Sequence, residues 1–442
     1  MKILIKKMSL RSSLIQKPAM NHKQKYIIFL LICVLLLGFI FPYSSHPMGK
    51  KKNEGKEELK FWHSIGTHNK EVLGELINSF NEVQKQTIVK GLFEGNDEDL
   101  YLKLLSRENL PDIVLIPVHL LPGLLRENLV VDLSSYIPQK TREEIAIRYW
   151  ESVTFEDRIY GIPFSFSSQI IYVNQNLLRI AGVRYTGEPS SWEKIFPILT
   201  KIQANTEGKW AIFIPMETTT QFISFIESYT GKLIYKDGAL TVKDKKTIEA
   251  MSYLQQLVYS HSLMPPKVTM SEGEQLFLSG KLGMMVAPSS MLVYTQSNLP
   301  YSLEVWHMPA AEGIKPLITG LCLALIKSNT KREKEAFVFL EYLLTPENIL
   351  KWHTHTGDPA IRVDVKNSID LLVFYEENPN YTTPVIDLER GRVFNPGVDY
   401  IALNKIIKMA LERIMINQEK PANVLTDIQN QIDNLWLAAQ SM

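Results

Sequence analysis

Residues 111–116 read PDIVLI, a short apolar run that follows a proline and an acidic residue. Short apolar runs with flanking prolines are typical of a strand that is buried on both faces. Two further strands are expected upstream, at residues 59–64 and 87–93, and helices are expected at 72–83, after Asp97 and at 118–127. Strands and helices that alternate at this spacing predict a parallel sheet covered by helices on both faces.

The middle of the chain has a different pattern, and the first pattern then returns. An extended run at 165–174 leads into mostly helical sequence between residues 190 and 290, after which a strand is expected at 320–326 and a helix at 331–344. A unit that is interrupted and resumes requires more than one crossing between two lobes. We therefore predict a two-lobed α/β clamp whose lobes present strand ends and helix N-termini to a shared cleft and close through a hinge. The expected lobes are 58–165 plus 316–350, and 166–315 plus 351–442.

The N-terminal residues have the pattern of an export signal. Residues 26–41 read YIIFLLICVLLLGFIF, without a charge, and seven basic residues precede them. A basic region before an apolar run is typical of a signal peptide, but the residues after Phe41 lack the small side chains of a cleavage site. Residues 1–45 are therefore expected to be either a cleaved signal peptide or a retained signal anchor, and 46–57 a polar tether. Either interpretation places the body outside the cytoplasm, in a periplasm or on the outer cell surface, attached to a membrane through the N-terminus.

Composition and motifs exclude several classes of function. The formal net charge is +1, and no basic run is interleaved with aromatic residues, so nucleic-acid binding is not expected. Two cysteines cannot supply a disulfide framework or a cysteine-rich metal site. No phosphate-binding glycine loop, His-Glu-x-x-His or Gly-x-Ser-x-Gly motif occurs, so no cofactor and no catalysis are expected. His353 and His355 could hold a metal, but we interpret them as a solvated helix end.

Five passages in order carry a family resemblance: FWHS at 61–64, NLPDIV at 109–114, LVVDLS at 129–134, YGIPF at 160–164 with IYVN at 171–174, and FLSGKLGMM at 277–285. They resemble the extracellular solute-binding proteins of ABC importers, in the maltose-binding-like cluster. EGN at 94–96 and FYEENP at 374–379 are most similar to the branch that binds glycerol-3-phosphate. The resemblance implies a monomeric, type II periplasmic-binding-protein-like clamp that delivers a small polar solute, a sugar or polyol, to the transmembrane subunits of a permease.

The same resemblance implies a set of ligand-binding residues. They are His63, Ser64, Asp97, Ser165, Ser167, Ser289, Ser290, Gly320, Asp358 and Asp399. Asp97 and Asp358 stand where the glycerol-3-phosphate branch has tyrosines, and Asp399 stands near its phosphate-binding arginine. Loss of a bidentate cation and gain of carboxylates argue against a phosphate ester and favour a polyhydroxyl or cationic ligand. The alternative is structural: the serines are ordinary loop residues, and Asp97 caps its helix.

Two other functions stay open from the sequence. A membrane-anchored sensor or adaptor could keep the same clamp without transport, since several expected ligand residues of the family are replaced. A tethered carbohydrate hydrolase could use a pair of carboxylates in the cleft, although no particular pair stands out.

Overall fold

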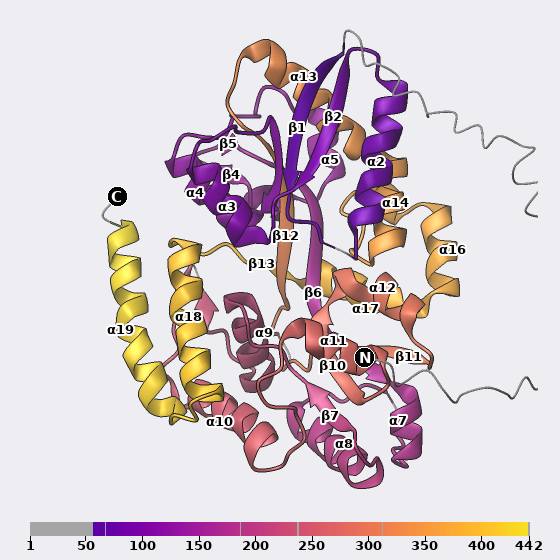
Figure 1. The fold of residues 1–442 in the computed structure, drawn as a ribbon, viewed down its shortest axis with the longest axis vertical. Coiled ribbons are helices and arrows are strands. Elements are labelled where there is room, and N and C mark those ends of the chain that lie inside the picture. The colour runs from indigo at the N-terminus through magenta and orange to yellow at the C-terminus, as the bar shows by residue number, and fades with distance from the viewer. Residues whose placement is uncertain (1–55, 67, 186, 237, 312, 441–442) are drawn as a thin grey trace, which may run out of the picture. The chain divides into compact units, whose positions relative to one another are not determined.

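The computed structural model describes residues 56–440 apart from 67, 186, 237 and 312 (Figure 1). The expected signal segment at 1–45 and most of the expected tether lie outside the described residues, while Glu57 already belongs to the first strand. Residues 57–442 form one compact unit. None of the helices in the described ranges is both long and apolar enough to cross a bilayer.

A mixed sheet runs through this unit. Its strands follow the order β2-β1-β3-β12-β6-β10-β7, with β11 paired to β6 and β13 paired to β12. The strands are β1 (Glu57–His63), β2 (Thr87–Phe93), β3 (Ile113–Pro117), β6 (Ile162–Asn174), β7 (Trp210–Phe213), β10 (Leu282–Pro288), β11 (Leu303–His307), β12 (Leu317–Leu325) and β13 (Arg392–Val393). Two small ribbons lie apart from the sheet: β4 (Thr154–Phe155) with β5 (Arg158–Ile159), and β8 (Tyr235–Lys236) with β9 (Ala239–Leu240).

The strand directions correct the expectation of a parallel sheet. β1 pairs in parallel with both β2 and β3, as the spacing predicted. β12, however, is antiparallel to β3 and to β6. β6 carries the chain out of the first unit and β12 carries it back in. The two strands therefore run in opposite directions.

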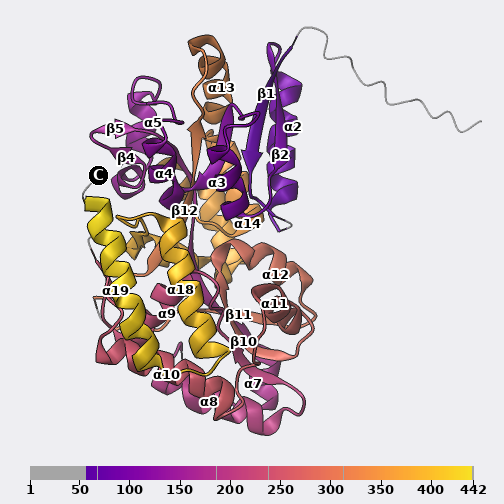
Figure 2. The same cartoon turned by 60° about the vertical axis from the view of Figure 1, so that its left-hand side comes forward.

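Helices cover the sheet on both faces (Figures 1 and 2). The longer ones are α2 (Lys70–Val83), α3 (Asp97–Leu105), α8 (Trp192–Asn205), α9 (Thr219–Thr230), α10 (Lys245–Tyr259), α11 (Met270–Leu278), α13 (Thr330–Leu343), α14 (Pro346–Thr356), α16 (Ile369–Glu377), α17 (Thr382–Arg390), α18 (Tyr400–Met415) and α19 (Pro421–Gln440). The shorter ones are the 3₁₀ turns η1 (Val118–Leu120), η2 (Ser289–Met291) and η3 (Pro379–Tyr381), and the helices α4 (Leu121–Arg126), α5 (Gln139–Glu144), α6 (Ile147–Glu151), α7 (Gln175–Ile180), α12 (Leu292–Asn298) and α15 (Val363–Lys366).

Local sequence fixes where several of these helices begin. Asn96, Thr218 and Thr269 each cap a helix and take part in a reciprocal capping box, at the starts of α3, α9 and α11. A capping box satisfies backbone N–H groups that have no partner inside the helix. These three helices therefore start at positions that their own sequences specify.

The apolar side chains form two separate hydrophobic cores. The first contains β1, β3, the first half of β6, most of β12 and α13. The second contains the second half of β6, β7, β10, and helices α8 to α10 and α18. The chain passes from the first core to the second within β6, between Phe166 and Ile170, and returns within β12, between Leu317 and Ile318.

The packing differs from the expected lobe boundary at residue 350. Trp352, Ile361 and Val365 belong to the first core, although the sequence division assigned them to the second lobe. The physical reason is that α14 packs against α2, which lies on the outer face of the first core. The chain reaches the second core again only near Tyr381 and Phe394.

An ion pair with a buried carboxyl group joins β1, the start of α13 and the residue before β3. Asp112 accepts hydrogen bonds from the guanidinium of Arg332 at the start of α13, one of them at 2.7 Å, and from the backbone N–H of Lys60 on β1 at 2.7 Å. Arg332 also donates to Glu57 at 2.9 Å. Asp112 is 7% exposed, so both its oxygens depend on these partners.

We predict that Asp112→Asn lowers the free energy of unfolding by about 1–3 kcal/mol, because the Arg332 guanidinium loses its buried charged acceptor. Glu127→Gln is the control: it removes a pair with Arg107 in which both side chains are 53% exposed, and such pairs contribute about 0–1 kcal/mol. Urea unfolding of the three proteins measures the difference. Equal effects of the two substitutions would contradict the account.

Candidate functional site

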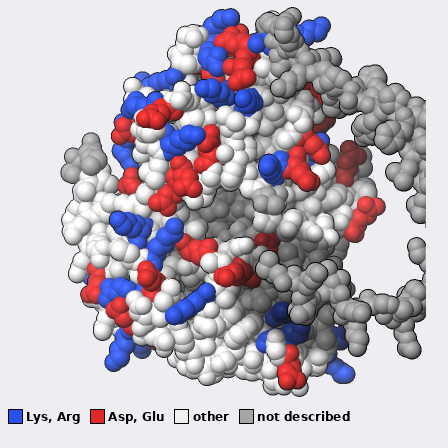
Figure 3. Space-filling model, viewed as in Figure 1, with Lys and Arg blue, Asp and Glu red and all other residues white. Residues whose placement is uncertain are grey.

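A cavity of about 490 Å³ lies between the two cores. Figure 3 shows the face of the molecule hollowed near its centre, with acidic and basic side chains around the opening. The wall contains the N-terminal ends of α3 and α9, the turns η1 and η2 after β3 and β10, and parts of β6, β12 and α18. Strand ends and helix N-termini thus meet at one space, as the sequence predicted.

Six of the residues predicted for the ligand site line this cavity. They are Asp97, Ser165, Ser167, Ser290, Gly320 and Asp358. They come from α3, β6, η2, β12 and the segment after α14, so elements of both cores contribute. Residues that are up to 261 positions apart in the sequence therefore share one wall.

The other four predicted residues lie outside the cavity wall. His63 is buried between aromatic rings at the end of β1, and burial lowers its pKa to about 4. Ser64 donates a hydrogen bond to Asp97, and Ser289 is buried with its hydroxyl 3.4 Å from the backbone N of Ser168. Asp399 caps α18 by accepting from the Ala402 N–H at 2.9 Å. Ser64, Ser289 and Asp399 thus have hydrogen-bond partners within the protein, whereas His63 makes ring contacts and its Nδ1 has no hydrogen-bond partner among the described residues.

Asp97 does not cap its helix, contrary to the structural alternative. The cap of α3 is Asn96, which accepts from the N–H groups of Glu98 and Asp99 at 2.9 and 3.0 Å. The Asp97 carboxylate is accessible from the cavity, and its pKa is raised because desolvation outweighs the hydrogen bond from Ser64. It is therefore an accessible acceptor at the start of a helix.

Asp358 is the most perturbed carboxyl group on the wall. Burial raises its pKa to about 7, although Ser165 donates to one of its oxygens. The indole Nε1 of Trp352 donates in turn to the Ser165 hydroxyl at 3.0 Å. The other oxygen, Oδ1, is buried and has no hydrogen-bond partner within the described part of the chain.

The interpretation of His353 as part of a solvated helix end was wrong. Its ring is fully buried, its Nδ1 lies 2.7 Å from the Asp358 carbonyl oxygen, and burial lowers its pKa to about 4. Packing of α14 against the first core turns this side chain inward, whereas His355 is exposed. The two rings therefore do not form a metal pair. The described residues hold no cluster of three or more His, Cys, Asp and Glu with metal-binding geometry.

Several wall residues were missed by the sequence interpretation. His119 lies in η1 beside Tyr400, at a ring distance of 4.0 Å, and burial lowers its pKa to about 3. Its Nδ1 is buried without a hydrogen-bond partner among the described residues. The sequence could have predicted this position, because the turn directly follows the carboxyl end of β3, where ligands bind in open α/β sheets.

The second core contributes missed polar residues from α9 and α18. Thr218 and Thr220 lie at the start of α9, where the capping sequence marks a helix N-terminus. Asn404 accepts from the backbone N–H and the hydroxyl of Thr219 at 2.9 and 3.1 Å. No local pattern predicts Asn404, because it lies inside a helix and reaches α9 only in the folded chain.

Acidic groups dominate the charge on the wall. Asp97, Glu98, Glu217 and Asp358 line the cavity together with one cation, Lys408, whose Nζ is 3.8 Å from Glu98. No arginine is among the described residues that line it. The wall thus offers many hydrogen-bond acceptors and lacks the planar fork that favours phosphate.

Polar contacts connect the two cores on either side of the cavity. On one side, Arg126 lies 3.2 Å from Asp399. On the other, His68 lies 2.7 Å from Glu274, and Asn69 donates to the carbonyl oxygen of Ser290 at 3.3 Å. Asn69 and Ser290 also line the cavity, so the contact between them forms part of its wall.

The model of the bacterial extracellular solute-binding protein family matches residues 75–383. The chain belongs to this family. The relation predicted from the sequence is therefore confirmed.

Individual relatives agree with the family. The chain of this solute-binding protein is 23% identical to the sn-glycerol-3-phosphate-binding periplasmic protein UgpB of Brucella abortus, over 75% of this chain and 81% of that protein. It is 24% identical to the arabinooligosaccharide-binding protein of Halalkalibacterium halodurans, over 74% and 76%. The crystal structure of UgpB from Mycobacterium tuberculosis in complex with glycerophosphocholine superposes with a TM-score of 0.78 at 18% identity, over 88% of this chain and 100% of that one. The periplasmic-binding-protein-like α/β fold is thereby shown.

We predict that stability depends on pH through Asp358. Its folded pKa of about 7 lies above its ordinary value of 3.8, so the folded state binds more protons between these values, and the free energy of unfolding falls as pH rises from about 4 to about 7. Asp358→Asn removes the ionisation. The variant should gain about 4 kcal/mol relative to the wild type across that interval, since one pKa unit corresponds to about 1.4 kcal/mol. Urea unfolding from pH 4 to pH 8 measures the gain, and parallel pH profiles of the two proteins would contradict it.

Proposed function

We propose that this chain is the solute-capturing component of an ABC importer and that its ligand is a neutral or cationic polyhydroxyl molecule, of the sugar or polyol class. The solute enters the cavity between the two cores and is then delivered to the transmembrane subunits of a permease. The family consists of solute-binding proteins, and our proposal includes no catalytic step.

One observation carries the ligand class: acidic side chains outnumber basic ones on the described wall. Four carboxylates line the cavity beside a single lysine, and no arginine joins them within the described residues. In addition, Asp358 Oδ1 and His119 Nδ1 are buried without partners there. Buried polar atoms are normally hydrogen-bonded, and ligand hydroxyl or ammonium groups are donors that can pair with such acceptors.

The names of the relatives give a range of ligands for comparison. They include a glycerol phosphate, glycerophosphocholine and an arabinooligosaccharide. A phosphate dianion would meet the acidic side chains of Asp97 and Glu217 here and would find no arginine among the described lining residues, so like-charge repulsion disfavours it. We therefore expect the cavity to bind the hydroxyl-rich part of such ligands and not to bind a phosphate group.

Ligand contacts from both cores supply a reason for closure. Asp97 and Asp358 approach from the first core, whereas Thr218, Asn404 and Ser290 approach from the second. A solute that touches both sides at once binds better to a closed arrangement than to an open one. This difference in affinity shifts the population toward closure.

We further propose that the protein works outside the cytoplasm as a monomer and that residues 1–45 attach it to a membrane or direct its export. The apolar run at 26–41 and its basic flank support this attachment. The alternatives of a sensor without transport and of a carbohydrate hydrolase have no observation that favours them over solute capture.

We predict that thermal-shift screening of the purified protein will detect stabilisation by sugars, polyols or polyhydroxyl amines. Ligand that binds the folded state alone raises the melting temperature by mass action. sn-Glycerol-3-phosphate should leave it unchanged, because the cavity wall lacks an arginine. Selective stabilisation by sn-glycerol-3-phosphate would refute the electrostatic argument.

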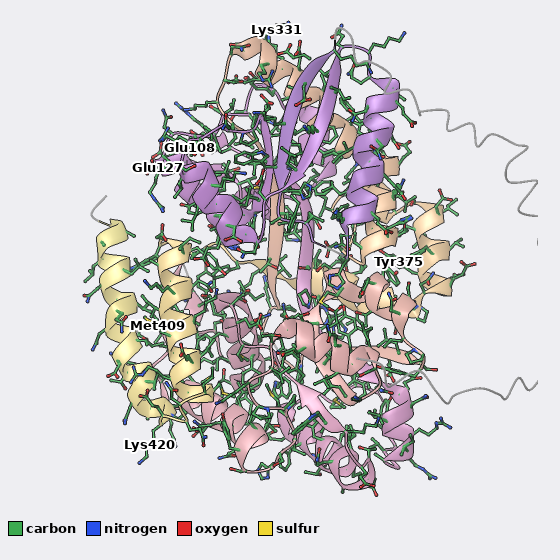
Figure 4. The ribbon with its side chains drawn as sticks, in the orientation of Figure 1. Glu108, Glu127, Lys331, Tyr375, Met409 and Lys420 are labelled. Carbon is green, nitrogen blue, oxygen red and sulfur yellow. The ribbon has the colours of Figure 1, made fainter. Side chains whose placement is uncertain are left out.

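We predict that Asp97→Asn weakens binding of the best solute from that screen about 10- to 100-fold, since a charge-assisted hydrogen bond contributes about 1.5–3 kcal/mol. Glu108→Gln is the matched control, because Glu108 lies on the outer surface of the same half of the molecule (Figure 4). Isothermal titration calorimetry gives both affinities. An unchanged affinity for Asp97→Asn would remove this residue from the site.

A further inference from the structure

A second pocket, of about 300 Å³, lies beside the cavity. It is bounded by the end of β7, by the loop at residues 264–269 and by the C-terminal half of α18. Its lining is mainly apolar, whereas the lining of the main cavity is rich in polar groups. We call it the side pocket.

The floor of the side pocket consists of side chains from the second core. Phe213, Ile214 and Leu411 are at most 4% exposed, and they form a closed apolar base. Ile416 is 42% exposed and stands at the rim. An apolar hollow of this size that reaches the surface is a feature that a bound apolar group can fill.

The side pocket and the main cavity share two residues. Glu217 and Lys408 line both spaces. Glu217 is fixed at this junction, because its Oε1 accepts from the backbone N–H of Met270, the first residue of α11, at 2.7 Å. The two spaces therefore adjoin at these two side chains.

The walls combine a rigid segment with adaptable side chains. Pro265 and Pro266 follow each other in the loop, and the pyrrolidine rings restrict its backbone. Met216, Met264 and Met415 line the same pocket. Methionine is flexible and polarisable, so it packs against apolar groups of differing shape.

We propose that the side pocket is a subsite for an apolar group carried by the solute, so that the full ligand is an amphiphile such as an alkyl or aryl glycoside or a polyol ether. The chemical class of the polar half of this ligand rests on the function proposed above. An apolar cavity of ~150 Å³ holds a benzene molecule, so the side pocket has room for an aryl ring or a short alkyl chain. Transfer of such a group out of water favours binding.

The first test compares matched probe pairs by calorimetry: methyl against hexyl β-glucoside and β-galactoside, and glycerol against 1-O-hexylglycerol. We expect the hexyl member of the accepted pair to bind at least tenfold more tightly. Val268→Asp, which places a charge on the pocket wall, should abolish this gain and leave the methyl probe unaffected. Met409→Asp is the control on exposed α18 surface (Figure 4), outside both linings, and should keep the gain.

The second test does not depend on the polar half. In protein labelled with ¹³C at the methionine methyl groups, 1-hexanol should shift the signals of Met216, Met264 and Met415 and leave that of Met409 in place. Thermal melts of Val268→Asp show whether that variant is folded, and the hexanol titration of the wild type does not rely on it.

The two proposals can fail separately. Binding of the methyl probes with no gain from the hexyl group overturns the side-pocket subsite and leaves solute capture intact. If no probe of either kind binds while hexanol shifts the three methionine signals, the polar ligand class is wrong and the apolar subsite is supported. Absence of any shift at these methionines overturns the subsite.

Discussion

The arrangement depends on two strands that belong to both hydrophobic cores. β6 is 13 residues long, and it pairs with β12 in its first half and with β10 and β11 in its second. Where β6 and β12 run side by side, Gly320 faces Phe166 so closely that a Cβ atom would lie 2.2 Å from the ring. These shared strands hold the two cores next to each other and set the position of the cavity between them.

The chemistry of the cavity depends on two acidic groups at this junction, the buried Asp358 and the accessible Asp97. Desolvation raises the pKa of Asp97 and, to about 7, that of Asp358. An unpaired carboxyl group inside the protein is costly, and a ligand donor offsets part of that cost. Asp358 Oδ1, which has no hydrogen-bond partner among the described residues, thus lies at a place where both cores can reach the same solute. In the function proposed above, binding and closure both depend on the hydrogen bonds between the solute and these residues.

Local sequence predicted where strands and helices form better than it predicted which elements pack or pair with each other. The strands at 59–64, 87–93 and 111–116 and most helices were found because periodicity and caps are local signals. The direction of β12 and the packing of α14 against α2 were not predicted, because they depend on contacts between segments that are distant in the sequence. The site shows the same division. Asp97 and Asp358 were predicted for the site and line the cavity. Ser64 was also predicted, but it donates a hydrogen bond to Asp97. Asn404 was missed, because it reaches the wall only through the packing of α18 against α9.

We propose that one solute bridges two bodies that move relative to each other. Double electron–electron resonance between spin labels at Glu108→Cys and Met409→Cys, which lie on opposite sides of the cavity, measures this directly in a chain with Cys33→Ser and Cys322→Ala (Figure 4). The account predicts that a saturating solute moves the distance distribution to shorter values. An unchanged distribution, with binding of the solute verified by calorimetry, would contradict it.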